Sequence, residues 1–158
     1  MYHWEGYRVR VLNAARGVAL ADRAGVADTA RSRRRGLLGS VSLGEGEGLV
    51  LMPCRQVHTF GMRYPIDAVF VDAGWTVVRV VRNLRPQRLS PLVWRARAVL
   101  EVPAGTAERT GTAPGDRLLI IPCSPSGGDN GEKVTARGGV PSGDGPRRRR
   151  TAGRIIDL

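Results

Sequence analysis

The stretch CRQVHTFGMRYPIDAVFVD, residues 54–72, sets four side chains with chemical potential within one apolar run. They are the thiol of Cys54, the imidazole of His58, the thioether of Met62 and the carboxylate of Asp67. A thiol with an imidazole and a carboxylate is the set of groups that a thiol-dependent or carboxylate-dependent hydrolase uses. The thiol, imidazole and thioether are also ligands that copper(I) accepts.

The spacing of these side chains tests the metal hypothesis. Cys54, His58 and Met62 are four residues apart. Side chains at that spacing lie about 6 Å apart on a helix, but about 13 Å apart on a strand. The segment holds β-branched and aromatic residues, Gly61 and Pro65, and no helix cap, so an extended or looped path is predicted. We therefore expect no metal site and no cofactor here.

Asp67 is the polar member of a strand pattern. It lies on the same alternating face as Val69 and Val71, where an apolar residue is the natural choice. A carboxylate at such a position must accept hydrogen bonds. We expect it to hold a neighbouring loop through His58, Thr59 or backbone amides. The alternative is a general base or a ligand carboxylate in a cleft. For Cys54, the expected role is that of a small buried apolar residue.

The elements that must position these groups are mostly strands. A two-residue hairpin loop is predicted at Ala73-Gly74, with the glycine at positive φ, and a type II turn is predicted at Pro114-Gly115. Alternating or continuous apolar runs predict strands at residues 7–12, 48–53, 66–72, 75–81, 96–102 and 116–121.

Two helices are predicted. In DTARSRRRGLLG, Asp28 can cap the helix start, basic residues occupy the carboxyl end and Gly39 can terminate the helix. A single-turn helix is expected at 106–111. Short strands with tight turns and one or two short helices indicate an α+β fold, a compact β-rich domain built on a strongly bent mixed sheet or a small barrel.

Three sequence blocks resemble the bacterial and archaeal family called domain of unknown function 192. They are ADTARSRRRGLLGSVSLGEGEGLVLMP, VHTFGMRYPIDAVFVD and VLEVPAGTAERTGTAPGDRL, in this order, and the likeness covers residues 7–122. The motifs fall on Arg35-Gly36-Leu37-Leu38, Gly46-Glu47-Gly48, His58-Thr59 with Met62, Ile66-Asp67, Glu101 with Ala104-Gly105, and Gly115-Asp116. The resemblance implies a compact β-rich mixed domain, and implies no accepted activity, cofactor or catalytic residue.

The net charge of +11 suggests a polyanionic partner, but it is spread along the chain. Residues 1–123 hold 18 arginines against 10 acids, and residues 124–158 hold 7 basic residues against 4 acids. Residues 124–158 are rich in Ser, Gly, Pro and Asp and are predicted to be a disordered basic tail after a single domain at 1–123. The run Arg147, Arg148, Arg149, Arg150 could bind nucleic acid, although a solvated tail is its commoner meaning.

Composition excludes several other classes. At 42% hydrophobic and 25% charged residues, and without a long apolar run, the chain is expected to be a cytoplasmic protein with no transmembrane segment and no export signal. Cys54 and Cys123 form no CxxC pair, so neither a disulfide framework nor a zinc site is indicated. Whether the two thiols approach each other is left open.

These observations lead to one expectation and two alternatives. We expect a small non-catalytic binding or accessory module for a protein or small molecule, with a groove near His58, Met62, Asp67 and Trp75. The alternatives are a hydrolase that uses Cys54, His58 and Asp67, and a nucleic-acid-binding protein that acts through its tail. Arg35 could tie the sheet through Glu47, Asp67 or Glu101, or clamp an anion. The candidate polar site residues are His58, Thr59, Met62, Asp67, Arg35, Glu101 and Asp116.

Overall fold

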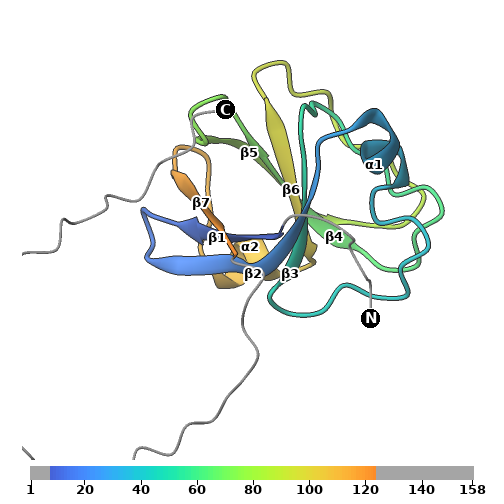
Figure 1. Cartoon of the computed structure of the whole chain (residues 1–158), viewed down its shortest axis with the longest axis horizontal. Helices are drawn as coiled ribbons and strands as arrows, with labels where there is room; N and C mark the ends of the chain where they lie inside the picture. The colour runs from blue at the N-terminus through green and yellow to red at the C-terminus, as the bar shows by residue number, and fades with distance from the viewer. Residues whose placement is uncertain (1–7, 124–158) are drawn as a thin grey trace, which may run out of the picture. The chain divides into compact units, whose positions relative to one another are not determined.

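The computed structural model describes residues 8–123, which form seven strands and two short helices (Figure 1). The predicted tail at 124–158 and its arginine run at 147–150 lie outside the described residues. The elements are β1 (Arg8–Asn13), β2 (Val18–Ala27), α1 (Ala30–Arg35), β3 (Glu47–Leu51), β4 (Ile66–Val71), β5 (Val77–Leu84), β6 (Ala98–Pro103), α2 (Thr106–Arg109) and β7 (Leu118–Pro122).

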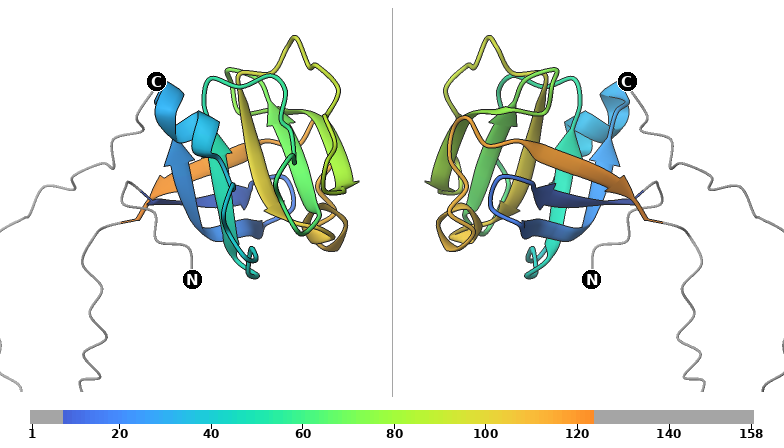
Figure 2. Two further views of the ribbon diagram at one scale, coloured as in Figure 1. Left: turned by 90° about the vertical axis from the view of Figure 1, so that its right-hand side faces the viewer. Right: turned by 90° about the vertical axis from the view of Figure 1, so that its left-hand side faces the viewer.

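The seven strands form one mixed sheet in the order β5-β4-β6-β3-β2-β1-β7. The sheet curls strongly into a half-barrel (Figure 2), which confirms the predicted α+β fold class. Its two edge strands meet at one end, where Thr76 bridges Arg117 and the Leu118 amide donates to the Trp75 carbonyl at 2.9 Å. Residues far apart in the chain therefore close the curl.

One pair of neighbours, β2 and β3, is parallel, whereas the other neighbours are antiparallel. A parallel pair needs a crossover connection, because the chain must return to the same end of the sheet. Residues 28–46 make that return and carry α1. The crossover thus lays α1 over one face of the sheet, and this placement creates the pocket described below.

The helix α1 is shorter than predicted. Its N-cap is Thr29 and not Asp28, because Thr29 and Ser32 form a reciprocal capping box. The helix ends at Gly36, three residues before Gly39, since Gly36 already takes a positive φ of 46°. The second predicted helix is present as α2, which ends at Arg109.

Two other local predictions are corrected by the structure. The β4–β5 connection spans residues 72–76 and not two residues, because the Asp72 side chain accepts hydrogen bonds from the Gly74 and Thr76 amides. The residue with positive φ is Trp75, at 60°, and not Gly74. The long strand β2 had no prediction, because VALADRAGVA mixes small and charged residues without a simple alternation.

The predicted turn at Pro114-Gly115 agrees with the backbone. Gly115 has a φ of 94°, and the Asp116 amide donates to the Ala113 carbonyl at 3.1 Å. Both features belong to a type II turn.

The apolar core lies on both faces of the sheet. The inner face gathers side chains from all seven strands, among them Val11, Leu100 and Leu118. The outer face of β3, β4 and β6 forms a second cluster with Leu37 and Val57, which come from segments that cover it. The strand β4, which lies between β5 and β6, is buried at every position, since both of its faces are covered.

Candidate functional site

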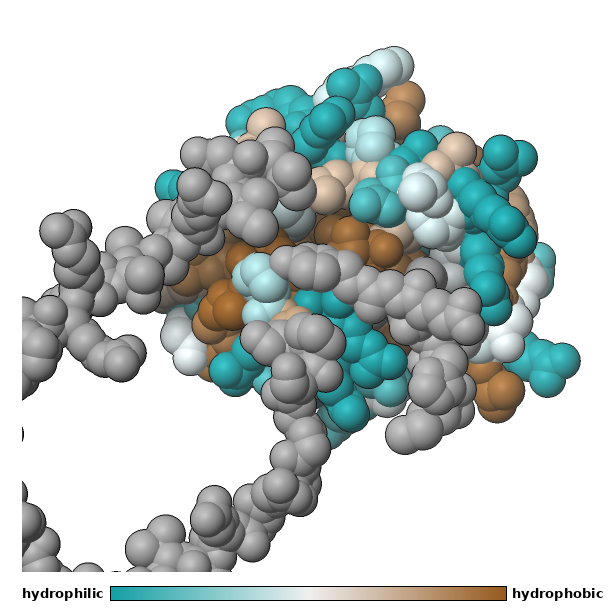
Figure 3. Space-filling view, viewed as in Figure 1, coloured by the Kyte–Doolittle hydropathy of each residue, from teal (hydrophilic) through white to brown (hydrophobic). Residues whose placement is uncertain are grey.

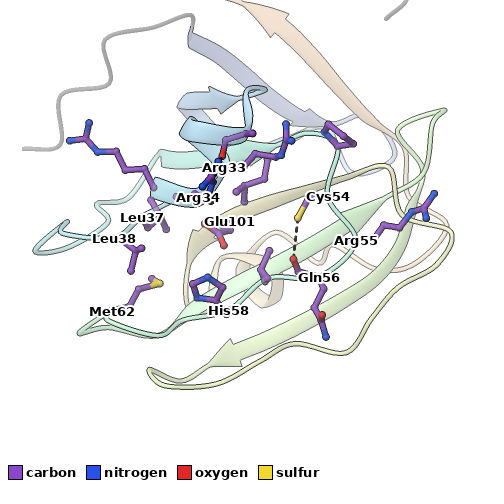
Figure 4. Close-up of a pocket in the computed structure, with 16 residues that line it drawn as sticks. Arg33, Arg34, Leu37, Leu38, Cys54, Arg55, Gln56, His58, Met62 and Glu101 are labelled. Atoms are coloured by element: carbon purple, nitrogen blue, oxygen red, sulfur yellow. Dashed lines mark hydrogen bonds between the residues drawn. The ribbon is translucent and has the colours of Figure 1, made fainter.

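A pocket of about 440 Å³ opens on the outer face, between the α1 crossover and the segment that follows β3 (Figure 4). Its apolar wall is formed by Leu37, Leu51, Val57 and Met62, all of them buried in the fold. The crossover supplies one side of the pocket, and residues 53–58 supply the other. The floor includes Glu101 of β6.

Glu101 is a carboxyl in the middle of an apolar face. Its neighbours across β3 and β4 are Leu49 and Ala68, both in the outer cluster. Figure 4 shows the Glu101 side chain amid the side chains of Leu37, Met62, His58 and Cys54.

The Glu101 side chain lies in an environment that disfavours charge. The residue is only 3% exposed, and its side chain lines the pocket. Burial raises the pKa of Glu101 from 4.5 to about 8, because the surrounding protein disfavours the charged form. At neutral pH the group is therefore mostly a neutral acid, which can donate a hydrogen bond.

Arginines surround the mouth of the pocket. Arg33, Arg34, Arg35 and Arg55 line it, and hydrophilic residues gather over α1 in Figure 3. Arg33 is anchored, since its Nη1 donates to the carbonyls of Asp28 at 2.7 Å and Met52 at 3.1 Å. Glu101 is the one acidic residue among those that line this pocket. The mouth is accordingly positive while the floor is neutral.

Cys54 and His58 both line the pocket but do not act as a pair. The Cys54 sulfur donates to the Gln56 carbonyl at 3.2 Å, whereas the His58 ring stacks on Phe60 with their centroids 5.4 Å apart. Burial is the main cause that raises the pKa of the Cys54 thiol above 9.0. A nucleophilic cysteine needs a lowered pKa, so this environment opposes thiol catalysis.

Asp67 lies away from the pocket. It is fully buried, and its two carboxylate oxygens accept from the Asn83 amide at 2.8 Å and the Ala107 amide at 2.9 Å. It therefore joins β4 to the end of β5 and to α2. Of the two proposed roles, the hydrogen bonds match loop holding through backbone amides, and they do not bring Asp67 to Cys54 or His58.

Thr59 also makes structural hydrogen bonds. Its amide donates to the Arg88 carbonyl at 2.8 Å and its hydroxyl donates to the Arg85 carbonyl at 2.6 Å. Thr59 thus fixes the loop that follows β5.

Asp116 belongs to a separate buried network at the end of the half-barrel. It accepts from Asn13 at 2.9 Å and from Arg16 at 3.1 Å. These bonds, led by that of Asn13, lower the pKa of Asp116 from 3.8 to about 2.

The structure thus brings together only part of the predicted set. One pocket is lined by Cys54, His58, Met62, Arg35 and Glu101. The chain from Cys54 to Met62 follows an irregular path and forms no helix. Asp67, Thr59, Asp116 and Trp75 lie elsewhere and border no part of this pocket. Among residues 8–123, no three His, Cys, Asp or Glu side chains are placed to hold a metal ion. The two described cysteines are free thiols.

Sequence reasoning missed Arg33 and Asn13. Arg33 shows no distinguishing signal within the run RRR, because only the fold makes it the arginine that binds the Met52 carbonyl. Asn13 at the end of an alternating strand was a detectable signal, since a polar residue there continues the buried face of Val9 and Val11.

The fold and the pocket define a small α+β half-barrel domain with a polar group buried under an arginine-lined mouth. The family model of the domain of unknown function 192 family, described as an uncharacterised ACR, matches residues 11–120. The chain belongs to this family. No helix in the described part of the chain is long and apolar enough to cross a membrane.

Two solved structures are similar to the chain. One, a protein of unknown function from Novosphingobium aromaticivorans DSM 12444, is 26% identical with a TM-score of 0.62, over 71% of this chain and 83% of its own. The other, from Sinorhizobium meliloti 1021, is described as a proposed transcription regulator; it is 24% identical with a TM-score of 0.62, over 76% of this chain and 97% of its own. No curated protein matches the chain.

Proposed function

We propose that this domain is a non-catalytic module that binds a small molecule in the pocket above Glu101. The observation that carries the proposal is the Glu101 carboxyl, which is 3% exposed and lines the pocket among apolar side chains. A few polar groups in an otherwise apolar pocket are typical of a ligand site. A ligand in the pocket can form a hydrogen bond with this carboxyl.

The surroundings of Glu101 support binding more than catalysis. A hydrolase needs a nucleophile, a base within hydrogen-bond reach and a group that orients the base. In the described chain, the Cys54 thiol donates to the Gln56 carbonyl, and Asp67 is held by two amides outside the pocket. The pocket does combine apolar walls with a few polar groups, which is typical of ligand sites.

The test is a ligand screen on the full chain by thermal denaturation. Three proteins are compared: the wild type, Glu101→Leu and Glu108→Leu, because leucine removes both the donor and the acceptor of the carboxyl. Glu108 is an exposed residue of α2 outside the pocket, so it controls for the same chemical change. We expect ligands that raise the melting temperature of the wild type and of Glu108→Leu by several degrees and raise that of Glu101→Leu much less. A library that yields no such compound, or only compounds that stabilise all three proteins equally, would contradict the proposal.

Nucleic-acid binding through Arg147–Arg150 remains a separate proposal. These residues lie outside the described part of the chain, and the support comes from their charge and from the relative described as a proposed transcription regulator. The whole-molecule prediction in the Discussion tests it.

A further inference from the structure

We propose that the pocket selects small organic anions, whose charged group meets the arginines at the mouth and whose inner end accepts a hydrogen bond from Glu101. This inference rests on the proposed function and adds the chemical class of the ligand. It follows from three features of the pocket: the charge at its mouth, the apolar surface between mouth and floor, and the chemistry of the floor.

The first feature is a guanidinium already fixed in place. Arg33 is half-buried, and the two bonds of its Nη1 to the carbonyls of Asp28 and Met52 hold the side chain across the mouth. Its Nε and Nη2 have no partner among residues 8–123, and planar guanidinium groups recognise carboxylate and phosphate oxygens. Because the Arg33 side chain is already ordered, an anion that binds it pays little of the entropy of ordering it.

The second feature is the sign of the charge around the site. Exposed Arg34 and Arg55 also line the pocket, Arg34 on the side of Arg33 and Arg55 on the opposite side, while no acid other than Glu101 lines it. Such a set attracts anions and repels ammonium groups. An amine would need to pass the arginines before reaching Glu101, whereas an anion can stop at the mouth.

The third feature is the path inward. Leu37, Leu51, Val57 and Met62 present a buried apolar wall between the arginines and Glu101. Inorganic phosphate or sulfate would leave this wall empty and Glu101 without a partner. An organic anion with a ring or short chain covers the wall and can carry a carbonyl or hydroxyl oxygen to the floor. The volume of about 440 Å³ accommodates a molecule of that size.

A neutral Glu101 carboxyl is consistent with a ligand whose inner end carries a hydrogen-bond acceptor. Its raised pKa, about 8, makes the group a hydrogen-bond donor at neutral pH. The charged or titratable groups that line the same pocket are Arg33, Arg34, Arg35, Arg55, Cys54 and His58.

The experiment compares three probes of one shape and three charges, each with a hydroxyl oxygen at the inner end: 4-hydroxyphenylacetate, 4-hydroxyphenylacetamide and tyramine. Each is titrated into the full chain labelled with ¹⁵N, and amide shifts at Leu37, Val57 and Glu101 report pocket occupancy. We expect 4-hydroxyphenylacetate to bind at least about tenfold more tightly than 4-hydroxyphenylacetamide, since a charge-assisted bond is worth about 1.4 kcal/mol or more. The amine should cause no shifts at these three amides.

Variants locate the charge recognition. Arg33→Gln should weaken 4-hydroxyphenylacetate binding about tenfold and leave 4-hydroxyphenylacetamide binding unchanged. Arg79→Gln, at an exposed position of β5 outside the pocket, is the matched control and should change neither affinity. Because Arg33 also binds two backbone carbonyls, Arg34→Gln is measured alongside it, and a smaller loss of 4-hydroxyphenylacetate affinity is expected there.

The outcomes separate this inference from the proposed function. If 4-hydroxyphenylacetamide or tyramine shifts the pocket amides as strongly as 4-hydroxyphenylacetate, the anion selectivity is wrong and a ligand-binding pocket still stands. If none of the three probes shifts them, the inference is overturned as well, and the Glu101-dependent library screen then decides the proposed function by itself.

Discussion

At the scale of single residues, three buried carboxyls occupy three different environments. Asp67 accepts from two backbone amides, Asp116 accepts from Asn13 and Arg16, and Glu101 lies among apolar side chains. The first two carboxyls join elements that are distant in sequence. The third carboxyl lines the pocket, which is why we propose that it contacts a ligand.

The first prediction concerns the pH dependence of stability through Glu101. Between pH 4.5 and about 8 the folded protein keeps a proton that the unfolded chain has released. The contribution of Glu101 to stability is therefore complete below pH 4.5 and is lost as the pH rises toward 8. Glu101→Gln cannot ionise. We therefore expect the melting temperature of the variant minus that of the wild type to increase from pH 5 to pH 8.5.

Melting curves of both proteins across this range measure the effect. Glu108→Gln serves as the control and should follow the wild type at every pH. A constant difference between Glu101→Gln and the wild type would show that folding does not raise the pKa of Glu101.

The second prediction concerns Asp67. Asp67→Ala leaves the amides of Asn83 and Ala107 buried without their acceptor, so we expect a loss of about 1–3 kcal/mol in the free energy of unfolding. Cys54→Ala should cost less, because Cys54 is half-buried and makes one weak hydrogen bond. Chemical denaturation measures both.

Asp28→Ala is the control for Asp67→Ala, since the Asp28 side chain is exposed. Equal or greater stability of Asp67→Ala relative to the wild type would instead place Asp67 among the residues kept for binding or chemistry.

At the scale of elements, one asparagine joins the β1–β2 hairpin to the turn before β7. The Asn13 side chain donates to Thr112 at 3.1 Å and to Asp116 at 2.9 Å, while its carbonyl oxygen accepts from the amides of Ala15 and Arg16. These four bonds are made by a residue with no exposed surface. The antiparallel pairing of β1 with the edge strand β7 reaches Asn13, which lies opposite Leu118.

The third prediction follows from these bonds. Asn13→Ala should lower the free energy of unfolding by about 2–3 kcal/mol, because buried partners lose their hydrogen bonds together. It should also raise the pKa of Asp116, since the Asn13 bond is the largest cause of its depression. Urea denaturation and carboxyl NMR titration measure the two effects. An Asp116 titration that stays near pH 2 in the variant would contradict the assigned cause.

At the scale of the whole molecule, the basic charge is divided between the domain and the residues beyond it. Residues 1–123 carry a net +8 and residues 124–158 a net +3. Some arginines of the folded part form ion pairs, such as Arg16 with Asp116 and Arg10 with Asp22, but basic residues still outnumber acids there. The chain therefore presents excess positive charge whatever its ligand is.

The fourth prediction separates the two proposed roles. If Arg147–Arg150 bind nucleic acid, replacing all four by alanine in the full chain should abolish most binding to a DNA duplex and flatten its salt dependence. Fluorescence anisotropy from 50 to 300 mM salt measures this. Arg79→Ala with Arg82→Ala, on exposed β5, controls for a general loss of charge. Unchanged DNA affinity in the fourfold variant would contradict the tail proposal.

The sequence by itself determined the local elements that depend on nearby residues. The apolar runs at 66–72 and 96–102, the turn at Pro114-Gly115 and the start of α2 follow from periodicity and turn chemistry, which act over a few positions. The same patterns indicated a bent β-rich sheet, and the motif spacing identified the family. β2 was missed because its small and charged residues carry no alternation of that kind.

The tertiary structure alone decided which polar residues share a site. Cys54, His58, Asp67 and Glu101 all appeared as candidates, yet Asp67 turned toward α2 while Glu101 turned toward the crossover. The physical reason is that a strand alternates its side chains between two faces, and both faces of the strands β3, β4 and β6 are buried. Which face holds a pocket depends on where the α1 crossover is laid, and that is settled by the parallel pairing of β2 with β3.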